Sequence, residues 1–136
     1  MNATPNLDII CKKVVDCYKK IYGDKIRGIF LYGSYARGDF DEESDIDFAA
    51  IVEGEKPQWN EKRSNLISRT GEIDLEYDVF ISPKVISAEY FDKYFIEMPY
   101  YKNILKEGKC LAWKCRNSIQ QRRWILQRGK KFSWDE

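Results

Sequence analysis

Two aspartates separated by a single residue, Asp45 and Asp47, stand at the start of an otherwise apolar segment. The segment continues to Val52 and is rich in residues that favour β-strands, so it predicts a strand. Alternate side chains of a strand point to the same face, which would place both carboxylates on one face, about 7 Å apart at the backbone. Like charges at this separation repel each other unless a cation lies between them, so the pair indicates a divalent metal site.

A phosphate-binding turn is predicted a few residues upstream. Gly33 and Ser34 follow a second strand-forming segment, residues 26–32, and lead into a short helical turn. Backbone amides and a hydroxyl at the start of such a turn can bind phosphate oxygens, and glycine allows the backbone to approach them closely. Arg37, one turn further on, is either a further phosphate donor or the ion-pair partner of an acid in the following loop.

A third carboxylate near the pair would complete a two-metal site, and residues 73–81 offer candidates. Acids alternate with apolar residues in this segment, which predicts a strand with Asp74, Glu76 and Asp78 on one face. The chain contains no histidine, the commonest general base, so an acid would accept the proton of an attacking hydroxyl. Asp78 is the preferred third acid and Asp74 is the alternative.

Other ion-binding and phosphate-binding motifs do not fit the chain. Counted from Asp39, a calcium-binding EF-hand loop would need glycine at Ser44 and glutamate at Ala50. The GxxxxGKS/T motif of a P-loop is missing, and the four cysteines show no CxxC spacing. Without histidine a mixed Cys/His zinc site is excluded. We therefore predict reduced, structural cysteines.

The remaining elements are predicted from apolar periodicity and from the positions of glycine and proline. Helices are expected over residues 7–21, 58–70, 88–95 and 99–107. A chain of 136 residues is long enough for one compact domain. It has no run of about 18 apolar residues and does not begin with the pattern of a secretory signal, so we expect no membrane association and a cytoplasmic location.

Basic charge is concentrated at the C-terminal end. Residues 116–136 hold six Lys/Arg and two acids, although the whole chain has a net charge of only +1. We therefore expect a main domain over residues 1–115 and a basic, helical C-terminal extension over residues 116–136. Its cations alternate with Trp124, Phe132 and Trp134, a composition that could bind nucleic acid. A surface helix with a basic face explains the same composition and is preferred.

The combined pattern consists of Gly33-Ser34, ten further residues and Asp45-x-Asp47, with one strand before it and another that contains the second aspartate. In the segment GSYARGDFDEESDIDF it resembles the motif of the polymerase-beta-like nucleotidyltransferase superfamily. The resemblance is strongest to its small stand-alone members, the minimal nucleotidyltransferases. It extends over about residues 5–108 and leaves residues 109–136 unmatched.

The resemblance implies an α/β (α+β) class, with the polymerase-beta-like nucleotidyltransferase fold: a small mixed sheet with helices packed on one side. It also implies a nucleoside triphosphate, ATP or another NTP, held by Gly33 and Ser34. Two magnesium ions would be held by Asp45, Asp47 and the third acid. The reaction so implied is the transfer of a nucleoside monophosphate to a hydroxyl, with release of pyrophosphate.

The resemblance also implies a partner. Minimal nucleotidyltransferases are often antitoxins of a helical HEPN-domain RNase, and some attach AMP to a tyrosine of that protein. We therefore expect a toxin–antitoxin pair in which this chain modifies a HEPN protein. Two alternatives stay open: a docking module of the same fold without catalysis, and a nucleotidyltransferase that acts on a small molecule. Replacing Asp45 and Asp47 by asparagine would spare the function of a docking module and abolish that of an enzyme.

Overall fold

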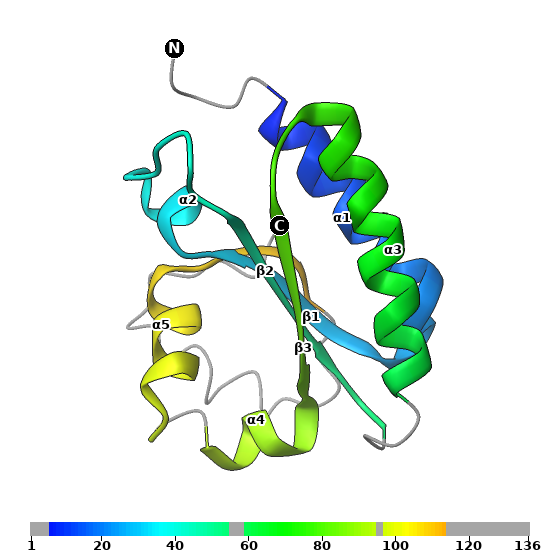
Figure 1. Ribbon diagram of the computed structural model, residues 1–136. Helices are drawn as coiled ribbons and strands as arrows, with labels where there is room; N and C mark the ends of the chain where they lie inside the picture. Colours follow the sequence, from blue (N-terminus) through cyan, green and yellow to red (C-terminus); the bar gives the residue numbers. More distant parts are fainter. Residues whose placement is uncertain (1–5, 55–58, 95–96, 114–136) are drawn as a thin grey trace.

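A computed structural model of the chain describes residues 6–54, 59–94 and 97–113. Its strands are β1 (Ile26–Tyr32), β2 (Ile46–Val52), β3 (Ile81–Ser87) and β4 (Lys109–Trp113). Its helices are α1 (Leu7–Tyr22), α2 (Ser34–Arg37), α3 (Trp59–Tyr77), α4 (Ala88–Tyr94) and α5 (Pro99–Glu107), and a turn of 3-10 helix, η1 (Gly23–Lys25), links α1 to β1. Figure 1 shows these elements arranged around a single sheet.

The four strands form one mixed sheet in the order β3-β2-β1-β4. β1 pairs antiparallel with β2 and with β4, whereas β2 and β3 run parallel. In this register Asp47 lies opposite Tyr32 of β1 and opposite Ser82 of β3. The aspartate pair is therefore placed at the start of β2, where β1 ends and β3 begins.

The predicted fold class is confirmed, but helices cover both faces of the sheet and not one face (Figure 1). Neighbouring residues of β1, such as Ile29 and Phe30, point to opposite faces and so enter different cores. The core under α1 and α3 includes Val14, Tyr18, Ile29, Phe48 and Leu66. The core under α4 and α5 includes Phe30, Ala49, Ile51, Phe91, Tyr101 and Ile104.

The strand predicted over residues 73–81 is wrong. Residues 59–77 form the helix α3, and β3 begins only at Ile81. The buried side chains Leu66, Thr70 and Ile73 recur at four- and three-residue steps, which gives one stripe that faces the core. Leu75, which an inward-facing strand position would have buried, is 88% exposed. The segment forms a helix and not a strand because the helical spacing of its apolar residues buries them in the core, whereas the alternating pattern of residues 73–81 does not.

The other elements predicted up to residue 107 are confirmed, with α3 longer than expected. β4 was not predicted; it pairs with β1 at one edge of the sheet. Pro83, expected to follow the third strand, lies inside β3, and proline is tolerated there because β3 is the opposite edge strand. Cys11, Cys17 and Cys110 are free thiols, as predicted. In the described part of the chain, no helix is both long and apolar enough to cross a membrane.

Two predictions concern residues that the structure does not describe. Cys115 lies outside the described residues, and so does the basic C-terminal extension, residues 116–136. The expected helix in that extension, and the choice between a nucleic-acid contact and a plain surface helix, therefore stay predictions.

Candidate active site

The turn at Gly33 lies directly against the second aspartate of the pair. Gly33 has φ 77° and ψ −157°, a backbone conformation that residues with a side chain rarely adopt. A Cβ atom added here would overlap the carboxylate of Asp47. The position thus requires glycine for two reasons, the backbone conformation and the close approach of the carboxylate.

A single helical turn, α2, follows Gly33. The backbone N–H groups of Ala36 and Arg37 both donate to the carbonyl of Gly33 at 3.0 Å, and Gly38 closes the turn by donating to Ser34 at 2.8 Å. Gly38 has φ 91°, the left-handed conformation that commonly ends a helix. The first amides of a helical turn have no carbonyl partner within it, so the start of α2 can offer N–H groups and the Ser34 hydroxyl to an anion.

The two aspartates differ in their surroundings. Asp45 is exposed just before β2, whereas Asp47 is half-buried in the strand. The pKa of Asp47 is raised first by burial and then by the charge of Asp45, while the cations Lys84 and Arg37 act in the opposite direction. The sign of the Asp45 effect is the one expected from two carboxylates on neighbouring positions of one face. This site therefore favours a positive charge.

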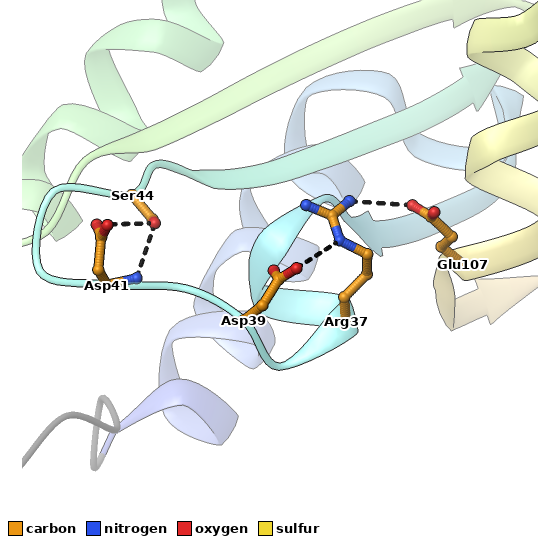
Figure 2. Close-up of polar contacts among 5 residues, drawn as sticks. All are labelled: Arg37, Asp39, Asp41, Ser44 and Glu107. Atoms are coloured by element: carbon orange, nitrogen blue, oxygen red, sulfur yellow. Dashed lines mark hydrogen bonds and ion pairs between the residues drawn. The ribbon is translucent and has the colours of Figure 1, made fainter.

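The loop between α2 and β2 is ordered by polar contacts that Figure 2 shows. Nε of Arg37 lies 3.1 Å from Oδ2 of Asp39, and Nη1 lies 3.1 Å from Oε1 of Glu107 in α5. Further along, the hydroxyl of Ser44 accepts the Asp41 N–H at 2.9 Å and donates to the Asp41 carboxylate at 3.1 Å. Of the two roles considered for Arg37, the ion pair is the one this geometry contains.

The candidates for the third acid occupy the connection between α3 and β3. Asp74 lies in the last turn of α3, and its Oδ1 accepts the backbone N–H of Ile81 at 2.9 Å. The pKa of Asp74 is raised mainly by burial; the Ile81 N–H lowers it, and the charge of Asp45 raises it further. Asp78 follows the helix, is exposed, and has φ 55°.

The structure does not gather the three acids into one cluster. Among the residues that are described, no group of three Asp, Glu, Cys or His side chains could together hold a metal ion. The charge of Asp45 raises the pKa of both Asp47 and Asp74, so Asp45 lies within electrostatic range of its neighbour in the pair and of the α3–β3 connection. The identity of the third acid stays a prediction.

Sequence reasoning missed Lys84. This residue lies in β3, two positions after Ser82, the residue that pairs with Asp47. Its Nζ donates to the hydroxyl of Ser82 at 3.3 Å, and its charge lowers the pKa of Asp47. The predicted strand ended at residue 81, so Lys84 carried no signal in the sequence. Only the register of β2 and β3 reveals it.

Comparisons with known proteins agree with this fold. The model of a family described as a nucleotidyltransferase domain matches residues 11–111. Two proteins of Methanocaldococcus jannaschii, both provisionally named protein adenylyltransferases, are similar in sequence. One is 36% identical over 100 residues, which is 74% of this chain and 92% of the relative. The other is 42% identical over 77 residues, 54% of this chain and 76% of the relative.

Solved structures show the same fold. A crystal structure of a toxin-antitoxin with AMP-PNP superposes with a TM-score of 0.53 at 19% identity, covering 88% of this chain and 82% of that one. A mutant of the toxin-antitoxin MntA-HpeT gives a TM-score of 0.54 at 17% identity, with the same coverage. The fold is thus the polymerase-beta-like nucleotidyltransferase fold, and the chain belongs to the nucleotidyltransferase domain family.

The donor set at the start of β2 fits a magnesium ion. Mg²⁺ takes oxygen ligands, commonly one or two carboxylates, and completes its octahedron with water and substrate phosphates. Asp45 and Asp47 supply two such carboxylates. Because glycine has no side chain, the backbone of Gly33 lies directly beside the carboxylate of Asp47. Both the pair and the turn are therefore suited to a phosphate-bound magnesium ion.

Proposed function

We propose that this nucleotidyltransferase moves AMP from ATP to a hydroxyl group of a partner protein. The main support for nucleotidyl transfer is the close packing of the Gly33 backbone against the Asp47 carboxylate. It juxtaposes a phosphate-binding turn and a metal-binding acid, which the transfer of a phosphate-linked group requires. The choice of AMP and of a protein acceptor is supported by the names of the two archaeal relatives.

In this proposal each residue has a defined role. Gly33 and Ser34 bind the β- and γ-phosphates through backbone amides and the hydroxyl. Asp45 and Asp47 would hold Mg²⁺, which when bound offsets the charge of the phosphates and orients the triphosphate. Arg37 exchanges part of its pairing with Asp39 for a phosphate oxygen when nucleotide is present.

The third acid is proposed to take the proton of the acceptor. An oxygen of the acceptor hydroxyl bonds to the α-phosphorus, and the bond from this phosphorus to the bridging oxygen of the β-phosphate breaks. Pyrophosphate leaves with that electron pair, and the hydroxyl proton passes to Asp78, or to Asp74 as the alternative. A carboxylate is suited to this role here because the chain has no histidine.

The acceptor is proposed to be a HEPN-domain protein, with the chain as its antitoxin. Two of the superposed structures are toxin–antitoxin assemblies, which supports a partner of this kind. Two apolar side chains at the α3–β3 connection are exposed to solvent. Leu75 is 88% exposed and Phe80 is 72% exposed. A protein acceptor would bring its hydroxyl to the acids and cover such residues.

The test is to incubate the purified chain with magnesium and each of the four α-labelled nucleoside triphosphates. Each reaction is run with and without a HEPN protein encoded beside the chain, and with the double variant Asp45→Asn/Asp47→Asn as control. We expect label on the HEPN protein when ATP is the nucleotide and the chain is unmutated. The other three nucleotides and the double variant should give no label. Transfer of label to a small molecule instead would contradict the proposed protein acceptor and support a nucleotidyltransferase that acts on small molecules.

A non-catalytic docking module is the second candidate, because the described residues do not assemble three acids around one metal. It predicts that the chain binds the HEPN protein with no transfer of label and no magnesium-dependent nucleotide binding. It also predicts that the double asparagine variant neutralises the toxin as well as the unmutated chain does.

A further inference from the structure

Lys84 lies on the same face of the sheet as the aspartate pair. β2 and β3 are parallel, with Asp47 opposite Ser82 and Ala49 opposite Lys84. Paired residues of parallel strands point to the same face, and every second residue along a strand does so as well. Lys84 therefore emerges next to the small side chain of Ala49, one pleat along β3 from the residue that pairs with Asp47.

The ammonium group extends back towards the site. Nζ of Lys84 is 3.3 Å from the hydroxyl of Ser82, which directs the side chain along β3 to the end of the sheet where Asp47 lies. The backbone of Lys84 is held in place, because the hydroxyl of the fully buried Tyr18 donates to its carbonyl at 2.9 Å. The strand thus fixes where the lysine begins, and the contact with Ser82 turns the side chain towards the end of the sheet that holds the acids.

Lys84 is also uncommitted to an ion pair. Across residues 6–54, 59–94 and 97–113, no carboxylate lies within 4.0 Å of its ammonium group, whereas Arg37 has two such partners. The lysine nevertheless faces the site, because it lies on the same face of the sheet as Asp47 and contacts Ser82, the residue that pairs with Asp47. A cation that faces a carboxylate pair without pairing to it is available for an anionic ligand.

The position of Lys84 relative to the turn selects which phosphate it meets. The Gly33 turn extends from β1 on one side of Asp47, and Lys84 stands on β3 on the other side. Adjacent strands are about 4.8 Å apart, so a triphosphate bound on the turn through its β- and γ-phosphates would extend past Asp47 and place its α-phosphate beside β3.

We propose that Lys84 binds the α-phosphoryl group of the nucleotide, the group that is transferred. The inference rests on the proposed function and adds to it a residue of the substrate site. The ammonium keeps its proton throughout, and offsets the negative charge on the phosphoryl oxygens while the acceptor oxygen bonds to phosphorus and pyrophosphate departs. Its charge is fixed in place before reaction, so it favours the transition state.

The experiment compares Lys84→Gln and Lys84→Arg with Lys25→Gln, a change at an exposed lysine before β1, at the end of that strand remote from Gly33. Transfer from ATP is measured as kcat and KM, and the binding of two inert probes is measured with magnesium present. The probes are the α,β-methylene analogue of ATP, which has all three phosphoryl groups, and pyrophosphate, which has only the two that correspond to the β- and γ-phosphates. Thermal unfolding of each variant shows whether it is folded.

Lys84→Gln is expected to lower kcat about 100-fold, the usual effect of removing one such donor. Its affinity for pyrophosphate should stay within about two-fold, since the turn binds the β- and γ-phosphates. Lys84→Arg should restore part of kcat, and Lys25→Gln should match the unmutated chain. Unchanged kcat in Lys84→Gln, or a loss of pyrophosphate affinity equal to the loss of affinity for the ATP analogue, would overturn the assignment. Failure of the unmutated chain to bind either probe or transfer label would instead overturn the proposed function.

Discussion

The side chain of Asp74 accepts the backbone N–H of Ile81 at 2.9 Å and thereby joins the last turn of α3 to the first residue of β3. One of its oxygens is therefore engaged in holding the connection, and the carboxyl is partly buried there. Asp78, four residues later, is exposed and is the one described non-glycine residue with positive φ. Strained backbone of this kind concentrates at functional sites, so Asp78 is the better candidate for the third acid.

Asp78→Asn is expected to reduce transfer about 100-fold, because it removes the carboxylate that takes the proton. Unfolding should be unaffected, since Asp78 is exposed. Asp78→Gly gives a second measurement, because glycine adopts the left-handed conformation without strain. This variant should unfold at the same or a higher temperature and still lose transfer. If Asp74→Asn loses transfer while both Asp78 variants keep it, the third acid is Asp74.

Gly33→Ala is expected to impair both the fold and the site. The alanine Cβ would overlap the Asp47 carboxylate and would be held at φ 77°, so we expect a loss of about 1–2 kcal/mol in unfolding free energy. Displacement of the turn or the acid should lower transfer by about 100-fold or more. Denaturant unfolding and transfer kinetics measure the two effects.

Gly71→Ala is the matched control for that substitution. Gly71 lies inside α3 and does not have a positive φ. A Cβ atom added at this position would have open space around it, with no heavy atom of another part of the fold within 4 Å. Alanine should therefore stabilise the helix by about 0.5–1 kcal/mol and leave transfer unchanged. Equal behaviour of the two variants would show that the contact between Gly33 and Asp47 has no special role.

Asp47→Asn is expected to stabilise the protein at neutral pH while abolishing transfer. Burial and the charge of Asp45 raise the pKa of Asp47, so the folded protein binds this proton more tightly than the unfolded chain. The contribution of Asp47 to stability consequently falls as pH rises from about 4 through the raised pKa. Asparagine removes that penalty, by no more than about 1 kcal/mol because the side chain is only half-buried.

Thermal unfolding at pH 7 and near pH 3.5 tests this sign. The gain from Asp47→Asn should be present at the higher pH and mostly lost at the lower one, where the aspartic acid is mainly neutral in both states. Glu42→Gln, a change at an exposed acid of the loop, should show little difference at either pH. A variant that is less stable at pH 7 would mean that Asp47 holds the fold together instead of providing a cation site.

The parts of this site that could be predicted from the sequence are those fixed by local rules. Gly33 and the pair Asp45 and Asp47 lie within one continuous segment, and both flanking strands are short, apolar and bounded by turn residues. Such patterns depend on neighbouring residues alone, so the turn, the two strands and their order along the chain were predicted correctly.

The parts that could not be predicted depend on which residues become buried when distant segments meet. The alternating acids after Ile73 fit a strand locally, but packing of Leu66 and Thr70 into the core makes the segment a helix. Because of this error the third strand was predicted at residues 73–81, before its actual position, and Lys84 was not considered. Its position near the aspartates depends on the pairing of β3 with β2. The edge strand β4 was missed for a similar reason, since it is defined by its pairing with β1.

A buried arginine at the other end of the sheet provides the last prediction. Arg27 in β1 is 5% exposed, and its Nη1 lies 2.6 Å from Oδ1 of Asp92 in α4. Its Nη2 lies 3.7 Å from Oε2 of Glu53, just after β2. The guanidinium thus joins two strands to α4 near the end of the sheet remote from Gly33, so it should affect stability and not the chemistry of transfer.

Asp92→Ala is expected to lower the free energy of unfolding by about 2–3 kcal/mol, because it leaves the buried cation of Arg27 without its nearest partner. The loss should stay below the largest values known for such pairs, since Asp92 is 28% exposed and Glu53 remains. Glu89→Ala, at an exposed position of the same helix, should change stability by less than about 0.5 kcal/mol. Denaturant unfolding compares the two, and transfer kinetics at a temperature where both are folded should match the unmutated chain. A loss of transfer in folded Asp92→Ala would show that α4 and the site are coupled through the sheet, contrary to the separation of the two ends inferred here.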